Sequence, residues 1–234
     1  MVGKISYFCH MIPHEVPFID IHTHHCSIAS GTQWSAAIHP WKVSWQSDLS
    51  FLETLLKENR IVAIGETGLD RAHKESFELQ MASFEKHILL SEQYQKPLII
   101  HNVHATAEIL QCFKKHQPQQ PWIIHGFNGS EKEVRQLTEK GIYLSVGESI
   151  YYQNRKIIKS IKSIPLDYLF LETDTSEKTI EQIYGKASVL LNIPLEQLKQ
   201  QIFANFAKLW KTGNNALDCS SATMALINLD EAMC

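Results

Sequence analysis

The sequence predicts an α/β protein with a TIM-type (β/α) barrel, and three observations lead to this fold class. Short apolar runs bounded by Gly, Pro and polar residues recur from Phe18 onward, as is typical of buried parallel strands. Amphipathic helical patterns alternate with these runs, which indicates parallel β/α architecture. Histidines and carboxylates stand at the ends of the runs, and barrels of this type keep their chemistry at the carboxyl ends of their strands.

Seven apolar runs are predicted to be strands. In chain order they cover residues 18–21, 34–39, 61–66, 97–101, 122–126, 142–146 and 168–173. The segment between the first two runs is too short to form a parallel crossover, which needs a dozen or so residues. Since a complete barrel has eight strands, one β/α unit is missing after the first strand. Either a cryptic strand lies around Ile28, or the barrel is distorted or incomplete at that corner.

Apolar residues at helical spacing predict the helices between and after these strands. In chain order they cover residues 48–58, 74–95, 104–115, 130–140, 154–162, 177–191 and 195–209. Asp48 is expected to be the N-cap of the first helix, Gly141 to end the fourth, and Pro194 to start the last.

The predicted barrel domain spans residues 18–211, within a chain whose 234 residues suit a single domain of this kind. An N-terminal extension, 1–17, precedes it. A C-terminal tail, 212–234, follows it and is expected to be poorly ordered or to form a short docking helix.

Composition narrows the class of protein further. The chain is 44% hydrophobic and 20% charged, so it can bury a sizeable core. Its net charge of −3 gives no general attraction to nucleic acid, so a polyanion would need a local patch or a metal. No apolar run approaches the roughly 18 residues of a membrane span. Five scattered cysteines and a start unlike a signal peptide lead us to expect a cytoplasmic protein with no membrane partner.

Six side chains of the metal-ligand type stand at the strand ends. They are His22, His24, Glu66, His101, His125 and Asp174. His22 and His24 lie two residues apart, on one face of a strand end, so both could reach one metal. Any single one of these histidines could equally be structural. Together they predict a site for one or two divalent ions, and imidazole favours Zn²⁺ over the oxygen-loving Mg²⁺ and Ca²⁺.

Two of the six are also predicted to be catalytic. Glu66 is either an exposed turn residue or a carboxylate that bridges two metal ions. Asp174 follows an apolar strand, where a carboxylate is costly unless it is paired or binds a metal, and it could deprotonate the attacking water. His39 and His104 are predicted substrate contacts, the latter because the first turn of a helix suits an anion. Trp41 and Trp45 could stack on a base or merely cover an edge of the core.

The motifs around these residues resemble those of the TatD family of metal-dependent hydrolases. They are Ile19–His24, Ala37–Pro40, Gly65–Asp70, Ile100–His101, His125–Gly129, Leu171–Asp174 and Ile202–Trp210. The resemblance covers nearly the whole chain and implies a TIM barrel of the amidohydrolase-like superfamily with a two-metal site. It also implies that the six residues are the metal ligands and that the reaction is phosphodiester hydrolysis, typically of DNA.

The sequence departs from the family pattern at three places. The β/α unit that usually lies between the His-x-His and His-Pro motifs is absent. The chain reads His101-Asn102-Val103-His104 where the family usually carries an Arg in a His-Ser-Arg-like motif, and Thr175–Lys178 replaces a basic, Pro-rich loop. Because Arg and Lys are the natural grips for phosphate, the sequence supports metal chemistry more directly than a nucleic-acid substrate.

Three hypotheses about function remain. The first is hydrolysis of a phosphodiester, in DNA or in a small molecule, by a metal-activated water with two ions, Zn²⁺ being expected and Mg²⁺ or Mn²⁺ being alternatives. The second keeps the site but changes the bond to a C–N or carboxylic-ester bond. The third is a non-catalytic barrel scaffold, which the missing unit suggests and the complete set of six ligands opposes.

Overall fold

The fold is built on one parallel sheet that curves into a barrel-like surface. The computed structural model of the chain describes residues 16–25, 33–210 and 223–228. Eight strands follow the order β1-β8-β2-β3-β4-β5-β6-β7. They are β1 (Phe18–Thr23), β2 (Gln33–Ala36), β3 (Ala63–Asp70), β4 (Leu98–Val103), β5 (Trp122–Ile124), β6 (Tyr143–Val146), β7 (Leu169–Leu171) and β8 (Thr223–Asn228).

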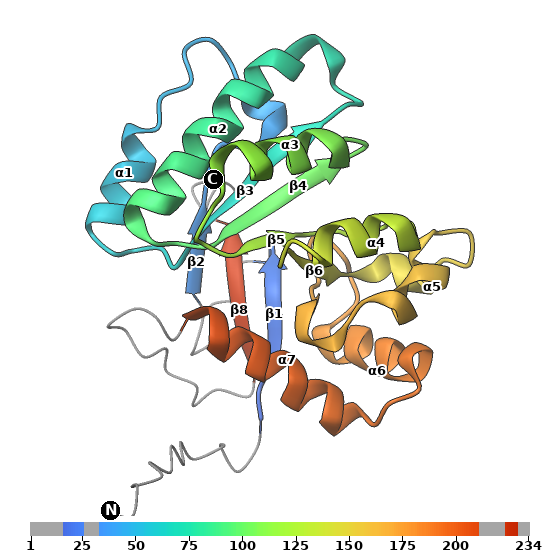
Figure 1. Cartoon of the computed structure of the whole chain (residues 1–234). Coiled ribbons are helices and arrows are strands. Elements are labelled where there is room, and N and C mark those ends of the chain that lie inside the picture. The colour runs from blue at the N-terminus through green and yellow to red at the C-terminus, as the bar shows by residue number, and fades with distance from the viewer. Residues whose placement is uncertain (1–15, 26–32, 211–222, 229–234) are drawn as a thin grey trace, which may run out of the picture.

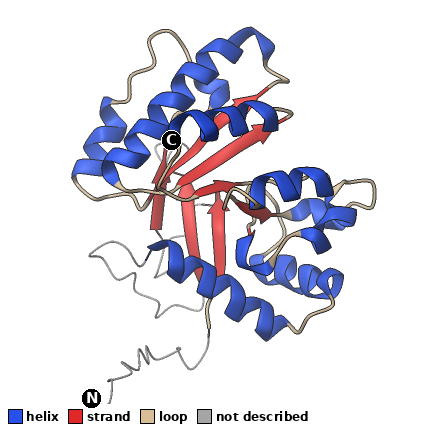
Figure 2. Ribbon diagram, in the orientation of Figure 1, coloured by secondary structure: helices blue, strands red, loops and turns tan. Residues whose placement is uncertain are grey.

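The helices lie on the outside of the sheet. They are α1 (Ser50–Lys57), α2 (Phe77–Tyr94), α3 (Thr106–His116), α4 (Glu131–Thr138), α5 (Ile157–Ser160), α6 (Ile180–Leu191) and α7 (Leu195–Trp210). Figures 1 and 2 show α1, α2 and α3 grouped on one side and α4 to α7 on the other, with the strands between the two groups. This alternation of buried parallel strands and covering helices confirms the predicted fold class, a TIM-type barrel distorted after its first strand.

The helix predictions are confirmed, with two corrections in detail. The predicted basic helix over 154–162 is only the single turn α5 followed by the 3-10 turn Ile161–Ser163. Asp48 is not the N-cap of α1, because Leu49 holds that position. The carboxylate of Asp48 instead accepts hydrogen bonds from the backbone N–H (3.1 Å) and the hydroxyl (2.6 Å) of Ser50.

The eighth strand comes from the segment predicted to be a tail. β8 lies between β1 and β2 and runs parallel to both, with Ile19 opposite Met224 on one side and Trp34 opposite Ile227 on the other. The prediction of a poorly ordered end or a docking helix is therefore wrong for residues 223–228. The missing unit leaves the facing edges of β1 and β2 with backbone groups that need partners, and β8 supplies them.

Several sequence predictions fall outside the described residues. They concern the N-terminal extension up to residue 15, the cryptic strand around Ile28, and the tail on either side of β8. The sheet itself continues past residue 211, the predicted end of the domain, because β8 belongs to it.

β1 and β7, the first and last strands in the sheet order, meet at their carboxyl ends. The backbone N–H of His24 donates to the carbonyl of Asp174 (3.1 Å), and the N–H of Asp174 donates to the carbonyl of His22 (3.0 Å). These two bonds join the end of β1 to the residues that follow β7. The curved sheet therefore closes at the edge where the predicted ligands stand.

The interior is apolar on both faces of the sheet. Every residue of β3 is buried, and isoleucines on neighbouring strands, such as Ile64, Ile99 and Ile123, are fully buried. Each such side chain contributes roughly 1.5–3 kcal/mol through the area removed from water, so the sheet gives the strand ends a rigid base.

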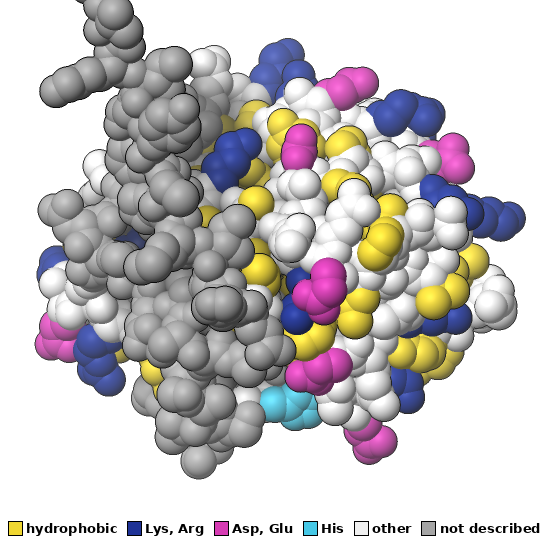
Figure 3. All heavy atoms as spheres, turned by 90° about the horizontal axis from the view of Figure 1, so that it is seen from below, with side chains coloured by type: hydrophobic (Ala, Val, Ile, Leu, Met, Phe, Trp, Pro, Cys, Tyr) yellow, Lys and Arg dark blue, Asp and Glu magenta, His cyan; other side chains and the backbone are white. Residues whose placement is uncertain are grey.

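The surface shows no concentration of one charge on the face seen from below. Lys and Arg side chains lie interspersed with Asp and Glu on the part that grey atoms do not cover (Figure 3). None of the helices in the described ranges combines the length and apolar character of a bilayer span.

Candidate metal centre

The six predicted ligands converge around Glu66 at the carboxyl end of the sheet. One carboxylate oxygen, Oε1, lies 2.5 Å from Nδ1 of His101 and 2.6 Å from Nε2 of His125. The other, Oε2, lies 3.4 Å from Nε2 of His22 and 3.6 Å from Nε2 of His24. Each oxygen of one buried carboxylate thus faces a different pair of imidazoles.

Asp174 joins the pair formed by His22 and His24. Its Oδ1 lies 3.5 Å from Nε2 of His24 and 3.9 Å from Nε2 of His22. These three residues form one set whose donor atoms all lie within 4.8 Å of one another, and His22, Glu66 and His125 form another. A third group is His39, Glu66 and His101, so Glu66 is common to two of the three groups, as expected of a carboxylate placed between two ions.

The two predicted substrate contacts differ in position. His39 lies in the cluster, with Nε2 3.2 Å from Oε1 of Glu66, and its Nδ1 accepts the backbone N–H of Trp41 at 3.2 Å. Because Nδ1 is the acceptor, Nε2 carries the proton and can donate. His104 is exposed just beyond β4 and belongs to none of the three candidate ligand groups. The substrate-binding role of both residues stays a prediction.

The close approach of β3 and β4 depends on Gly68. Its φ of +144° is a conformation that side chains other than glycine's rarely adopt, and a Cβ here would lie 2.1 Å from the carbonyl oxygen of His101. Since Glu66 and His101 stand beside this contact, the glycine determines how near they come.

Three buried carboxylates beside the ligands were not predicted. Asp20 accepts the backbone N–H (3.0 Å) and the hydroxyl (2.6 Å) of Thr173. Glu172 accepts the backbone N–H of Gly126 at 2.5 Å, and its Oε1 lies 3.6 Å from Nδ1 of His125. Asp70, the third, is 2% exposed.

Two of these carboxylates could have been predicted from the alternation of side chains between the two faces of a strand. Asp20 precedes His22 by two residues, and Glu172 precedes Asp174 by two residues, so each shares the ligand's face of an extended strand. An acid on the ligand face of an apolar run has to be paired, because burying an unpaired charge is costly.

The charges of the cluster are strongly coupled. Burial by itself raises the pKa of Glu66, but the charge of His125 and the hydrogen bonds from His101 and His125 hold that pKa well below its usual value. Burial by itself lowers the pKa of His125, yet the charge of Glu66 outweighs it and holds that pKa well above the usual value. The buried, ionised carboxylate of Glu66 is therefore stabilised by a positive charge beside it.

Two further carboxyl groups have raised pKa values. Burial raises the pKa of Asp20 to about 7, against the opposing effect of its hydrogen bonds from Thr173. Burial and then the charge of Glu172 raise the pKa of Asp174. Asp174 also has the more accessible side chain, 37% exposed against 4% for Glu66.

A divalent cation fits this set of residues. The ring of His22 is fully buried, yet neither of its nitrogens has a hydrogen-bond partner among the described residues. An unsatisfied buried polar atom is costly, and coordination would remove that cost for the nitrogen that binds the metal. Four imidazoles with two carboxylates match the preference of Zn²⁺ and related transition metals.

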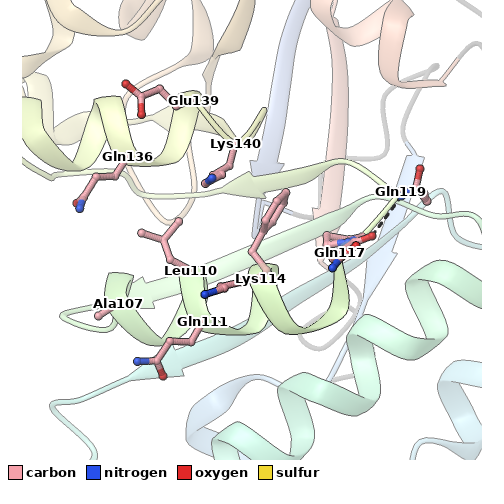
Figure 4. Close-up of a pocket in the computed structure, with 11 residues that line it drawn as sticks. Ala107, Leu110, Gln111, Lys114, Gln117, Gln119, Gln136, Glu139 and Lys140 are labelled. Carbon is pink, nitrogen blue, oxygen red and sulfur yellow. Dashed lines mark hydrogen bonds between the residues drawn. The ribbon is translucent and has the colours of Figure 1, made fainter.

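A groove on the surface of the described residues lies elsewhere. It runs between α3 and α4 and is lined mainly by long polar side chains, among them Gln111, Lys114, Gln136 and Glu139 (Figure 4). None of the six ligands lines it. This groove therefore lies apart from the ligand cluster at the sheet edge.

A parallel barrel with a cluster of imidazoles and carboxylates at the carboxyl ends of its strands defines the class of barrel metallohydrolases. The model of the "TatD related DNase" family matches residues 23–211. The chain belongs to the TatD family of metal-dependent hydrolases, and the predicted resemblance is confirmed.

Relatives support this assignment over different lengths. The chain is 33% identical over 144 residues to the uncharacterized metal-dependent hydrolase YabD of Bacillus subtilis, a match that covers 60% of this chain and 56% of that protein. It is 26% identical over 193 residues to the metal-dependent hydrolase YcfH of Escherichia coli, covering 76% and 73%. It is 28% identical over 149 residues to the deoxyribonuclease Tat-D of Schizosaccharomyces pombe, covering 62% and 47%.

Solved structures share the fold. The crystal structure of YjjV, a TatD homologue of Escherichia coli, superposes with a TM-score of 0.74 at 22% identity, covering 84% of this chain and 98% of that chain. A TatD family hydrolase of Entamoeba histolytica superposes with a TM-score of 0.69 at 17% identity, covering 84% and 98%.

Proposed function

We propose that this chain is a metal-dependent phosphodiesterase that hydrolyses DNA or a small phosphoester with two divalent ions, Zn²⁺ being expected. The observation that carries the proposal is the position of Glu66, whose two oxygens face separate groups of imidazoles. A relative that is named a deoxyribonuclease supports the choice of bond. The buried, unpaired thiol of Cys112 fits the reducing cytoplasm, which is the location we propose.

The ions would be held by two sets of side chains that share Glu66. His22, His24 and Asp174 would hold one, and His101 and His125 the other. When bound, such cations lower the pKa of water and neutralise charge on the attacking and leaving oxygens of a phosphodiester.

The remaining steps fall to the side chains themselves. Asp174 has the exposure and the raised pKa of a group that accepts the proton of the attacking water. His39 carries its proton on Nε2, which faces the cluster, and can donate it in a hydrogen bond to a phosphoryl oxygen. Glu66, ionised and buried, keeps the two sets of ligands together.

A second candidate is hydrolysis of a C–N or carboxylic-ester bond in a small molecule. It is favoured by the partners of the ligand carboxylates, since the ion pairs of Glu66 and Asp174 within the described residues are formed with histidines. No Lys or Arg takes part in those pairs. A phosphate would therefore be held by the metal ions and by His39.

The test is a substrate screen of metal-free protein to which Zn²⁺, Mn²⁺ or Mg²⁺ is restored. We expect metal-dependent cleavage of bis(p-nitrophenyl) phosphate and of single-stranded DNA, with little turnover of p-nitrophenyl acetate or of N-acyl amino acids. The opposite preference would establish the second candidate. Zinc binding with no turnover of any of these substrates would favour the hypothesis of a non-catalytic scaffold.

A variant separates catalysis from folding. Asp174→Asn should lower kcat at least about a thousandfold, because an amide cannot accept the proton. The backbone should be retained, since Asp174 has a φ of +54° and Asn tolerates that conformation. The exposed acid Asp48 provides the matched control, Asp48→Asn, which should keep full activity. Full activity of the Asp174 variant would contradict its assigned role.

A further inference from the structure

Asp70 is a buried carboxylate at the end of β3 that the proposed chemistry does not use. Its Oδ2 accepts the indole N–H of Trp41 at 2.7 Å and lies 3.3 Å from Nε2 of His101. The same oxygen lies 3.3 Å from Nδ1 of His73, and Oδ1 accepts the backbone N–H of Ala72 at 2.7 Å. One carboxylate therefore joins a predicted metal ligand to residues at the rim of the site.

The position of Asp70 is set from the core. Gln80, fully buried in α2, accepts the backbone N–H of Asp70 at 2.7 Å and donates to its carbonyl at 3.2 Å. Because both backbone groups are held by one buried side chain, the carboxylate has little freedom to move away from its partners.

The ring of His101 stands between two carboxylates. Its Nδ1 faces Glu66 at 2.5 Å and its Nε2 faces Asp70 at 3.3 Å. An imidazole that keeps its Nε2 proton for Asp70 can give up the Nδ1 proton that it donates to Glu66 and present the Nδ1 lone pair to a metal ion. His125 has the reverse arrangement, since its Nε2 faces Glu66 and its Nδ1 lies toward Glu172.

The second partner, Trp41, forms part of the rim. Trp41 is 58% exposed although its indole N–H is bound to a buried acid. The indole lies 4.9 Å from the ring of His39 and 5.9 Å from that of His101, and it is tilted by 33° against His73 at 4.8 Å. A flat apolar surface is thus held in a fixed orientation beside the cluster.

We propose that Asp70 is a positioning residue that makes His101 bind metal through Nδ1 and that fixes Trp41 as a contact for a planar ring of the substrate. The inference rests on the proposed metal centre and deepens it. It predicts that His101 and His125 use different ring nitrogens. It also predicts a preference for phosphodiesters that carry an aromatic group next to the scissile bond, because such a ring can stack on the indole.

The first test is zinc affinity, measured by competition with a chromophoric chelator. Asp70→Asn should weaken the binding of one of two ions by about 10- to 100-fold, the usual effect of removing a carboxylate that orients a ligand histidine. Asp48→Asn is the matched control, because Asp48 also accepts the backbone N–H of the residue two positions on but lies outside the site. It should bind zinc as the wild type does.

Trp41→Phe separates the two roles of Asp70. Phe retains an aromatic ring but lacks the N–H that bonds Asp70. Because Asp70 still stands beside His101, zinc affinity should stay within about twofold of the wild type. KM for bis(p-nitrophenyl) phosphate should rise several-fold with kcat nearly unchanged, whereas KM for a dialkyl phosphodiester should not change. Equal KM effects on both substrates would overturn the stacking role of Trp41.

The wild-type protein gives a readout that does not depend on the variants folding. In nitrogen-15 spectra of the zinc-loaded protein, the ring proton of His101 should reside on Nε2 and that of His125 on Nδ1. The opposite assignment for His101, or an Asp70 variant that binds zinc as tightly as the Asp48 variant, would overturn the inference and leave the proposed function standing. A wild-type protein that binds no zinc would count against both.

Discussion

His87, a fully buried histidine of α2, makes the stability of this protein sensitive to mild acid. Its Nδ1 lies 2.8 Å from the carbonyl of Ser83, and its Nε2 accepts the backbone N–H of Ile38 at 3.1 Å. The ring must be neutral for this, since a protonated Nε2 cannot accept. Burial lowers the pKa of His87 from 6.5 to about 4.

The magnitude follows from this pKa. Below pH 6.5 the unfolded chain takes up a proton at His87, whereas the folded protein does so only near pH 4. The unfolded state thus binds more protons between these values, and the stability from this group is complete above pH 6.5 and falls as the pH is lowered. The loss is about 2 kcal/mol by pH 5 and about 3 kcal/mol below pH 4.

The assay is urea unfolding of metal-free protein at pH 7 and pH 5, with His87→Gln beside the wild type. Gln can still accept the N–H of Ile38 but has no proton to gain. We expect it to be less stable than the wild type by about 1 kcal/mol at pH 7, for the lost bond to Ser83, and more stable by about 1 kcal/mol at pH 5. His104→Gln, at an exposed histidine, should follow the wild type. Parallel pH curves for wild type and His87→Gln would refute the reasoning.

Three further predictions concern the sheet and the metal. In a urea titration, Gly68→Ala should lower the unfolding free energy by about 3 kcal/mol or more. The control is Gly185→Ala inside α6, where a Cβ meets nothing within 4 Å, and it should raise the unfolding free energy by up to about 1 kcal/mol. A chain ending at Trp210 lacks β8 and should lose roughly 1 kcal/mol per ladder hydrogen bond, seen as an earlier urea midpoint; an unchanged midpoint would contradict the pairing. Zinc at about a hundred times its Kd should stabilise the wild type by about 3 kcal/mol in thermal scans, and His22→Gln should lose most of that gain.

The ligand cluster could be predicted from the sequence because parallel strands bring their carboxyl ends to one edge. A histidine or an acid that ends an apolar run therefore has a known destination, as Glu66 and His101 show. The same logic fails for β8. Its apolar stretch has no local feature that distinguishes a strand from a docking helix, and its partners, β1 and β2, lie at the other end of the sequence.

Asp48 and Asp70 show why the supporting residues were harder to predict. Each accepts the backbone N–H of the residue two positions on, so the two acids are alike in their local bonding. Only contacts with distant residues distinguish them: Gln80 and Trp41 hold Asp70 inside the protein, while Asp48 stays exposed. Such contacts depend on the packing of α2 against β3, which no local pattern contains.

The central place of β8 constrains the order in which the protein can be assembled during synthesis. β8 follows all the other strands along the chain, yet it lies between β1 and β2. As the chain leaves the ribosome, β1 with His22 emerges early and has to wait beside an open edge until α7 has been made. Such an edge can pair with other chains, so the nascent protein is exposed to aggregation during this interval. β1 is joined to the end of β7 without β8, so β8 closes the sheet on the other side of β1, and the ligands on β1 and β3 are held from both directions only after β8 has been made.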